Sequence, residues 1–297
     1  MKKTDYVVMA LMQAALEMKL GYVFVNRFIH ILKSQGVEIS RVFEYKKELP
    51  SQFVEFVKCA ENKMPAISKY FEQFLRRKIE FVSTENAYYP PNLKKRLGEK
   101  TPPCFFAVGN TAISIKKGVS VTGVRETLFD DEVFAWRMGE LCAKERLVTV
   151  SGGAEGVDSI ALDGALSNGG EALVYLPQGF EKSVFVRKNR RFLENRNLLC
   201  LSLCMPDMGF TGNNALERNV YIHSHGEITV TVRAKLRMGG SWSGACHNLE
   251  GGRTPAYVSD IPSPGNEALR EMGAKVLKRE ELLKPDYKLK SEIMELR

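Results

Sequence analysis

The first 82 residues carry apolar side chains at helical spacing and contain almost no glycine or proline. Two stretches show this clearly, VVMALMQAAL (7–16) and FVNRFIHIL (24–32). Apolar residues that recur every three or four positions form one face of an amphipathic helix. The pattern predicts a small all-helical domain over residues 1–82. A linker over 83–103 is expected to follow, because this stretch is rich in turn formers and ends in a double proline.

From residue 104 onward the pattern changes to short runs of β-branched and other apolar residues, most of them separated by helical segments. The expected strands are CFFAV (104–108), VSVTG (119–123), LVTV (147–150), ALVYL (172–176), LLCLSL (198–203), ITVTV (228–232) and PAYV (255–258). Alternation of strand and helix predicts right-handed crossovers and a parallel sheet with helices on both faces. The sequence therefore indicates an α/β fold after the helical domain.

Three loops follow expected strands at the edge of the sheet where ligands of such folds bind. They are TGVRE (122–126), SGGAEGVD (151–158) and PQG (177–179). The second lies between a strand and a helix, and free N–H groups at a helix start attract anions. Its spacing is not that of an ATPase phosphate loop. It therefore predicts either a phosphate cradle or a tight structural turn.

The side chains of these loops suit an anionic ligand. Gly152 and Gly153 allow a phosphate to approach the backbone closely, and the Ser151 hydroxyl can donate a hydrogen bond. Arg125, on the neighbouring loop, carries a guanidinium that can hold a phosphate with two hydrogen bonds. Asp158 is also explained without a ligand, since an acid in the first turn favours the helix dipole.

The amino-acid composition indicates the class of protein and the kind of partner that it binds. The formal net charge of +8, with 26% charged and 44% hydrophobic residues, favours a soluble protein with a polyanionic partner. Six dispersed cysteines are typical of a reduced, cytoplasmic protein. We find no signal peptide or membrane span, and the histidine and cysteine spacings match no zinc signature. No metal, cofactor or membrane partner is expected.

An ordered series of segments resembles the DNA-processing protein A (Smf) family, from about residue 89 to 277. The matching segments are YYPPNL, TPPCFFAVGN, VTGVR, SGGAEGVD, GALSNGGEALVYLPQG, ERN (217–219), GGSWSGA (239–245), GRTPAYV and GNEALREMGAKVL. The resemblance implies an extended Rossmann-like domain over 104–280, with a C-terminal tail over 281–297. It implies binding of single-stranded DNA and its delivery to a RecA-type recombinase in transformation or recombination. We also expect a homodimer.

Four departures from the family pattern change charged or polar positions. Glu155 replaces an arginine, Leu162 and Asp163 replace a histidine and an arginine, and Val220 replaces the second arginine of an RNR motif. They leave open whether recombinase loading is retained, and whether the chain acts in transformation or in defence against foreign DNA. The role of the helical domain is open as well.

A basic segment offers compensating charge, because five of the ten residues 187–196 are basic. Phe192 lies among them, and Phe185 comes just before them. Such a run suits backbone contacts and base stacking on a single strand. A solvated helix face with Phe192 in the core would give the same pattern. The candidate DNA- or phosphate-binding residues are Gly123, Arg125, Ser151, Gly152, Gly153, Gly156, Lys188, Arg190, Arg191, Arg218, Asn219 and Ser241.

Two alternatives belong to other functional classes. They are a Rossmann-like nucleotide-binding protein and a nucleoside-monophosphate phosphoribohydrolase, either of them in a defence system. The second would need a PGGxGTxxE stretch, which is missing, and Glu155 beside the glycine turn is the nearest carboxylate. We therefore expect a binding protein with no catalytic residues.

Overall fold

The computed structural model describes residues 2–294. The chain divides into two compact units, one formed by residues 2–89 and 97–108, the other by residues 90–96 and those from 109 onward. The boundaries expected from the sequence, at 82, 103 and 280, stay a prediction. Residue 1 and residues 295–297 of the expected segments lie outside the described residues.

The first unit is built on three helices whose apolar faces meet. They are α1 (Lys3–Glu17), α2 (Gly21–Ser34) and α3 (Ser51–Arg76), with the short 3-10 helix η1 (Ile39–Arg41) between the last two. Phe53 and Phe56 on α3 are three residues apart and lie on one helix face. Their ring centroids lie 5.0 and 5.4 Å from that of Phe28 on α2. The helical spacing seen in the sequence therefore produces a packed aromatic core.

Two strands complete this unit. Strands β1 (Glu80–Ser83) and β2 (Cys104–Gly109) pair antiparallel. Strand β1 was not expected from the sequence. It is held in part by Phe81, whose ring meets that of Phe71 on α3 edge to face at 5.4 Å. Between the two strands the chain forms α4 (Pro91–Leu97) and the 3-10 helix η2 (Gly98–Lys100).

The second unit contains a parallel sheet, as the alternating pattern predicts. Its strands are β3 (Gly118–Thr122), β4 (Val148–Ser151), β5 (Glu171–Leu176), β6 (Leu198–Ser202), β7 (Ile228–Thr231), β8 (Ala256–Ser259) and β9 (Lys275–Leu277). They lie in the order β6-β5-β4-β3-β7-β8-β9, and each neighbouring pair is parallel. The predicted α/β, Rossmann-like fold is confirmed.

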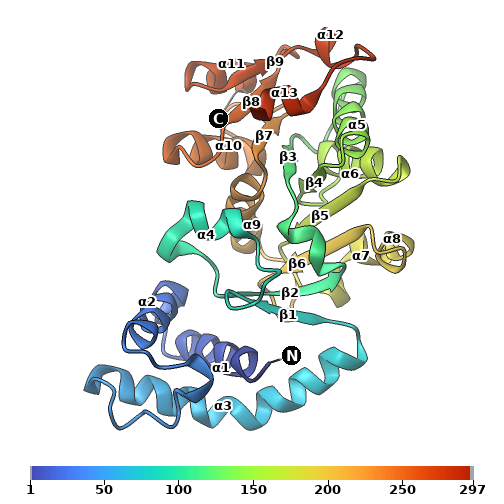
Figure 1. Ribbon diagram of the computed structural model, residues 1–297. Coiled ribbons are helices and arrows are strands. Elements are labelled where there is room, and N and C mark those ends of the chain that lie inside the picture. The colour runs from blue at the N-terminus through green and yellow to red at the C-terminus, as the bar shows by residue number, and fades with distance from the viewer. Residues whose placement is uncertain (1, 295–297) are drawn as a thin grey trace. The chain divides into compact units, whose positions relative to one another are not determined.

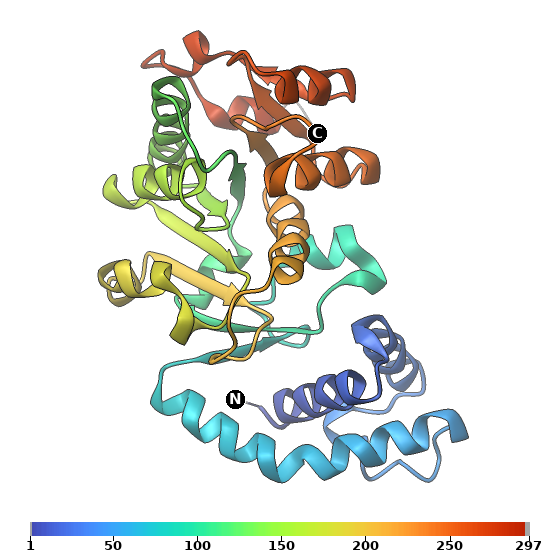
Figure 2. The same ribbon diagram turned by 180° about the vertical axis from the view of Figure 1, so that it is seen from behind.

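Helices cover both faces of this sheet (Figures 1 and 2). One face carries α5 (Phe129–Lys144) and α6 (Val157–Ser167), and the other carries α9 (Gly212–His225) and α10 (Gly239–Gly251). Strand β3 shows the alternation. Val119 and Val121 enter the core beneath α5 and α6. Ser120 points the opposite way, and its hydroxyl donates to the Ile222 carbonyl of α9 at 2.5 Å.

The remaining elements are short. They are the 3-10 helices η3 (Thr111–Ile115) and η4 (Phe180–Lys182), and the helices α7 (Val184–Lys188), α8 (Arg190–Glu194), α11 (Pro264–Glu271), α12 (Arg279–Leu282) and α13 (Leu289–Met294). The described part of the expected C-terminal tail packs on the α5 side of the sheet, where Leu282 and Leu289 are fully buried. Among residues 2–294, every helix is too short or too polar to cross a lipid bilayer.

The order of the strands creates a switch point between β3 and β7. The chain moves outward from β3 through β4 and β5 to β6, then returns to place β7 on the other side of β3. The loops that follow β3 and β7 therefore run to opposite sides of the sheet. In open parallel sheets, the crevice between such loops is where ligands bind.

Candidate functional site

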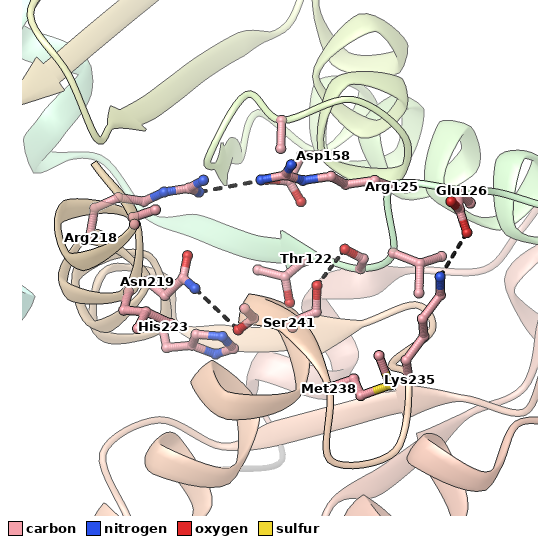
Figure 3. A pocket seen from close by; sticks show the side chains of 18 of the residues that line it. Thr122, Arg125, Glu126, Asp158, Arg218, Asn219, His223, Lys235, Met238 and Ser241 are labelled. Carbon is pink, nitrogen blue, oxygen red and sulfur yellow. Dashed lines mark hydrogen bonds and ion pairs between the residues drawn. The ribbon is translucent and has the colours of Figure 1, made fainter. Parts of the chain in front are cut away.

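A pocket of about 650 Å³ lies at this switch point (Figure 3). Its walls come from the loop after β3, the start of α9 and the segment that leads into α10. Five of the candidate residues line it, namely Gly123, Arg125, Arg218, Asn219 and Ser241. The volume falls within the range of about 300–1,000 Å³ that is typical of small-ligand sites.

A buried ion pair fixes the position of the loop that carries Arg125. Nη2 of Arg233 lies 2.5 Å from Oδ2 of Asp131 on α5, and the Asp131 side chain is fully buried. The same nitrogen of Arg233 donates to the carbonyl of Glu126 at 3.2 Å, and Oδ2 of Asp131 accepts from the N–H of Leu128 at 2.8 Å. The loop backbone is therefore fixed, while the Arg125 side chain is exposed.

A second ion pair closes over the glycine turn after β4. Nη1 of Arg218 lies 3.7 Å from Oδ2 of Asp158, and both side chains are buried. Asp158 also accepts the Gly152 N–H at 3.2 Å. The guanidinium rests so closely on Gly152 that a Cβ there would fall 1.2 Å from Nη1. Gly152 is therefore needed for this packing, whether or not a ligand binds.

Burial governs the protonation of this pair. It raises the pKa of Asp158 above its ordinary value, although the Arg218 charge opposes the rise. Burial also lowers the pKa of Arg218; Asp158 opposes this, and the nearby positive charge of Arg125 adds to it. The guanidinium groups of Arg125 and Arg218 thus act on one another at the pocket, and the Asp158 carboxylate pairs with the buried Arg218. Among residues 2–294, Arg125 has no carboxylate partner.

The other residues of the glycine turn are engaged within the fold. The Ser151 hydroxyl is fully buried and donates to the Val121 carbonyl at 2.6 Å. Gly153 is packed between Val174 and Phe185. Gly156 precedes α6 at φ +83°, and a Cβ there would fall 2.3 Å from the carbonyl oxygen of the loop after β3. Phosphate binding by Ser151, Gly152, Gly153 and Gly156 stays a prediction.

Two candidates on the opposite wall join α9, α10 and the β3 loop. The Asn219 amide donates to the Gly240 carbonyl at 3.1 Å. The Ser241 hydroxyl donates to the Gly123 carbonyl. These bonds bring the start of α10 against the loop that carries Arg125, as Figure 3 shows. The carbonyl oxygen of the Asn219 side chain points away from its bond to Gly240.

His223 is a buried polar residue of the pocket that sequence analysis did not identify as part of a site. It stands four residues after Asn219, on the same face of α9. Its Nδ1 lies 2.9 Å from the Thr229 hydroxyl. Burial, with the charges of Arg218 and Arg253 adding to it, lowers its pKa to about 4. The imidazole is therefore neutral at pH 7.

The basic segment lies outside the pocket lining, on α7 and α8. Lys188, Arg190 and Arg191 are exposed there. Arg190 pairs with Glu194 at 2.9 Å on the surface, and Arg191 covers the Phe192 ring at 4.4 Å. Phe192 itself is buried, so its ring is unavailable to a base. This segment supplies exposed positive charge. The half-buried Phe185 is its remaining candidate for stacking on a base.

The segment from Phe210 to Gly240 supplies the pocket residues that sequence analysis missed. They are chiefly Phe210, Leu216, His223, Lys235, Met238 and Gly240. Only the glycine pair before Ser241 gave a signal in the sequence, because it lies in a segment that resembles the family. Glu155 is exposed and lies outside the lining of the pocket. Within residues 2–294, no cluster of three or more metal-ligating side chains occurs.

Comparison with known proteins identifies the family. The model of the DNA recombination-mediator protein A family matches residues 80–286. The chain belongs to this family. The resemblance to DNA-processing protein A seen in the sequence is thereby confirmed, and the family match covers the sheet and every candidate site residue. No curated protein sequence matches the chain.

Two solved family members share its fold. The DNA processing protein A of Streptococcus pneumoniae is 21% identical, with a TM-score of 0.75 over 97% of this chain and 100% of that protein. The DNA processing protein A of Helicobacter pylori, whose single-stranded DNA binding mode has been described, is 23% identical. Its TM-score is 0.59 over 73% of this chain and 95% of that protein. At this level of sequence identity, the structural similarity shows a shared fold and nothing further.

Proposed function

We propose that this recombination-mediator protein binds single-stranded DNA along the carboxyl edge of the sheet. The observation that carries the proposal is the exposed Arg125, held on a fixed loop at the switch point with no carboxylate partner among residues 2–294. A guanidinium in that position binds a phosphate with two hydrogen bonds. The relative from H. pylori, described as a single-stranded DNA-binding protein, supports the same function.

The exposed charge of α7 extends this edge. Phe185 on α7 touches Gly153, and the adjacent Gly152 lies beneath Arg218 at the pocket. The ends of β5, β4, β3 and β7 thus form a continuous edge of about 15 Å, given a spacing of about 4.8 Å between strands. Arg125 follows the end of β3 at this edge, and the exposed Lys188 lies three residues after Phe185 on α7, so we propose that both contact one flexible strand.

We infer the biological role from the family. We propose that the bound strand is protected and passed to a RecA-type recombinase during transformation or recombination. We also propose that the protein works as a cytoplasmic homodimer without catalytic activity. The exposed position of Glu155, away from the pocket lining, gives no support to nucleoside-monophosphate hydrolysis.

Fluorescence anisotropy tests the proposal, with one oligonucleotide measured as a single strand and as a duplex at two salt concentrations. The single strand is expected to bind more tightly, with an affinity that falls steeply with salt because counterions are released on binding. Incubation with nucleoside monophosphates should release no free base. Equal affinity for the duplex, or no binding at low salt, would refute the proposal.

A further inference from the structure

We propose that the C-terminal half of α3 is a further contact surface for single-stranded nucleic acid, formed by Lys69, Tyr70 and Arg76. Phosphates would lie against the lysine and the arginine, and a base against the tyrosine ring. The surface belongs to the first unit, and α3 ends before residue 80, where the family match begins (Figure 1). It rests on the proposed function in that the ligand is the same single strand.

Basic side chains gather in this half of the helix. Residues 69–78 hold four cations and one carboxylate, Glu72. Lys69, Gln73 and Arg76 follow one another at four and three positions, so they lie along one face of α3, and all three are exposed. About 10 Å of helix axis separates Lys69 from Arg76, at a rise of about 1.5 Å per residue. One strand can therefore contact both.

The cations of this surface lack the counter-charges that occur elsewhere in the first unit. Seven other cations of the unit form ion pairs with glutamates, namely Lys3, Arg27, Lys33, Arg41, Lys46, Lys58 and Lys63. Among residues 2–294, by contrast, Lys69, Arg76 and Lys78 form no ion pair, and neither does Glu72. Clustered basic residues on one face of a helix are typical of a surface that binds nucleic acid.

The helix dipole explains only part of this charge. Cations favour the C-terminus of a helix, but the effect is confined to the last turn. Arg76 is the last residue of α3, whereas Lys69 lies seven residues, or about two turns, before it. The position of Lys69 therefore needs another reason, and a phosphate that lies along the helix supplies one.

Tyr70 adds an aromatic ring beside these charges. It is 39% exposed, and its ring lies nearly parallel to that of Phe74, at an interplanar angle of 13° and a centroid distance of 6.2 Å. Phe74 is buried and meets Phe71 edge to face at 5.9 Å. The core thus holds the Tyr70 ring in place at the surface. A base of a single strand can stack on such a ring, whereas the bases of a duplex are already stacked on one another.

A membrane surface fits these residues less well. Leu75 is 59% exposed, and basic helices with apolar side chains can lie on anionic lipids. Such a helix needs a free apolar face, however, and the apolar residues Ile67, Phe71 and Phe74 of α3 are buried within the protein. Leu75 is left as a single exposed apolar residue in this half of the helix, so we favour the nucleic acid.

Charge removal on the full chain tests the surface by fluorescence anisotropy with a single-stranded oligonucleotide. The double variant Lys69→Gln/Arg76→Gln removes two exposed charges and should leave the fold intact. It should weaken binding and reduce the slope of log affinity against log salt by about two units, one for each phosphate contact. The matched control is Lys19→Gln/Lys47→Gln, which removes two exposed charges of the same unit and should leave the slope unchanged.

Substitution of Tyr70 tests the stacked base. Tyr70→Ala should weaken the strand about tenfold, as the loss of one stacked base does. Tyr70→Phe keeps the ring and should bind as the wild type does. Equal affinities of Tyr70→Ala and Tyr70→Phe, or equal salt slopes of the two double variants, would overturn the inference.

Comparison with Arg125→Ala separates this inference from the proposed function. If Arg125→Ala weakens the strand and Lys69→Gln/Arg76→Gln does not, this inference alone fails. If only the α3 variant weakens it, the proposed site at the sheet edge fails and the α3 surface stands. A wild-type protein that binds no strand overturns both. Vesicles of phosphatidylserine and phosphatidylcholine provide the last arm, since vesicle binding that the α3 variant removes, with strand binding unchanged, would assign the surface to lipid.

Discussion

Arg218 on α9 and Asp158 on α6 form a buried ion pair, with Nη1 of the arginine 3.7 Å from Oδ2 of the aspartate. The pair joins two helices that lie on opposite faces of the sheet. It lies at the edge of the sheet where the parallel strands end. It also covers the Gly152 backbone. The glycine turn that resembles a phosphate cradle is thus occupied by a side chain of the protein itself.

The first prediction concerns this pair. Asp158→Asn leaves the Arg218 guanidinium buried without a counter-charge, and the free energy of unfolding should fall by about 3–5 kcal/mol. Urea denaturation at pH 7 measures the change. Glu194→Gln, which breaks the exposed pair with Arg190, is the control and should change stability little. If the two variants lose equal stability, the Arg218–Asp158 pair does not hold the turn together.

The second prediction concerns Arg125. Its side chain is exposed on a loop that other residues hold in place, so Arg125→Ala should leave stability unchanged. Loss of one phosphate contact should weaken single-strand binding and reduce the slope of log affinity against log salt by about one unit. Anisotropy titrations at three or more salt concentrations measure both effects.

Lys117→Ala is the matched control for Arg125→Ala. Lys117 is equally a cation and is exposed at the amino end of β3, whereas Arg125 follows the carboxyl end of the same strand. Its loss should change neither the affinity nor the salt slope appreciably. Equal effects of the two substitutions would mean that the strand responds to net charge and not to this edge of the sheet.

Much of the fold could be predicted because its signals are local. The β-branched runs from Val119 to Val258 all form strands, since a buried parallel strand requires a continuous apolar run. Strands β1 and β9 were missed. They have four and three residues, and β9 begins with an exposed lysine, Lys275, so neither carries an apolar run long enough to stand out.

The site was less predictable because its contacts are distant in sequence. The turn at Gly152 has the composition of a phosphate cradle, but Arg218 lies on it from a helix 66 residues further along the chain. The hydroxyl of Ser151 is taken by Val121 on the neighbouring strand. Glycine composition shows that something approaches the backbone closely. It does not show whether that group is a ligand or another part of the protein.

The third prediction concerns Glu155, where the family pattern has an arginine. The side chain is exposed on the loop after β4, next to the proposed path of the strand. Glu155→Arg removes a negative charge and adds a positive one, so single-strand binding should tighten and its salt slope should steepen by about one unit. Glu250→Arg, an equal change on the exposed surface of α10, is the control. If both variants tighten binding equally, Glu155 does not adjoin the strand.

The fourth prediction concerns pH and His223. Burial lowers the pKa of His223 from 6.5 to about 4, so between these values the unfolded chain binds a proton that the folded protein does not. The stability contributed by the neutral imidazole is therefore fully present above pH 6.5 and is lost as the pH falls to about 4. At about 1.4 kcal/mol for each pKa unit, the loss is about 3 kcal/mol.

Urea denaturation of the wild type and of His223→Gln between pH 7 and pH 4 tests this assignment. The comparison is made between variants because other groups titrate in the same range. His225, whose pKa burial lowers to about 3, adds a loss of the same sign. Asp158, whose pKa burial raises, acts in the opposite direction. His223→Gln should lose about 3 kcal/mol less than the wild type over this interval, whereas the exposed His247→Gln should lose as much as the wild type. If His223→Gln and His247→Gln show the same pH dependence, His223 is not held neutral by its burial at the pocket.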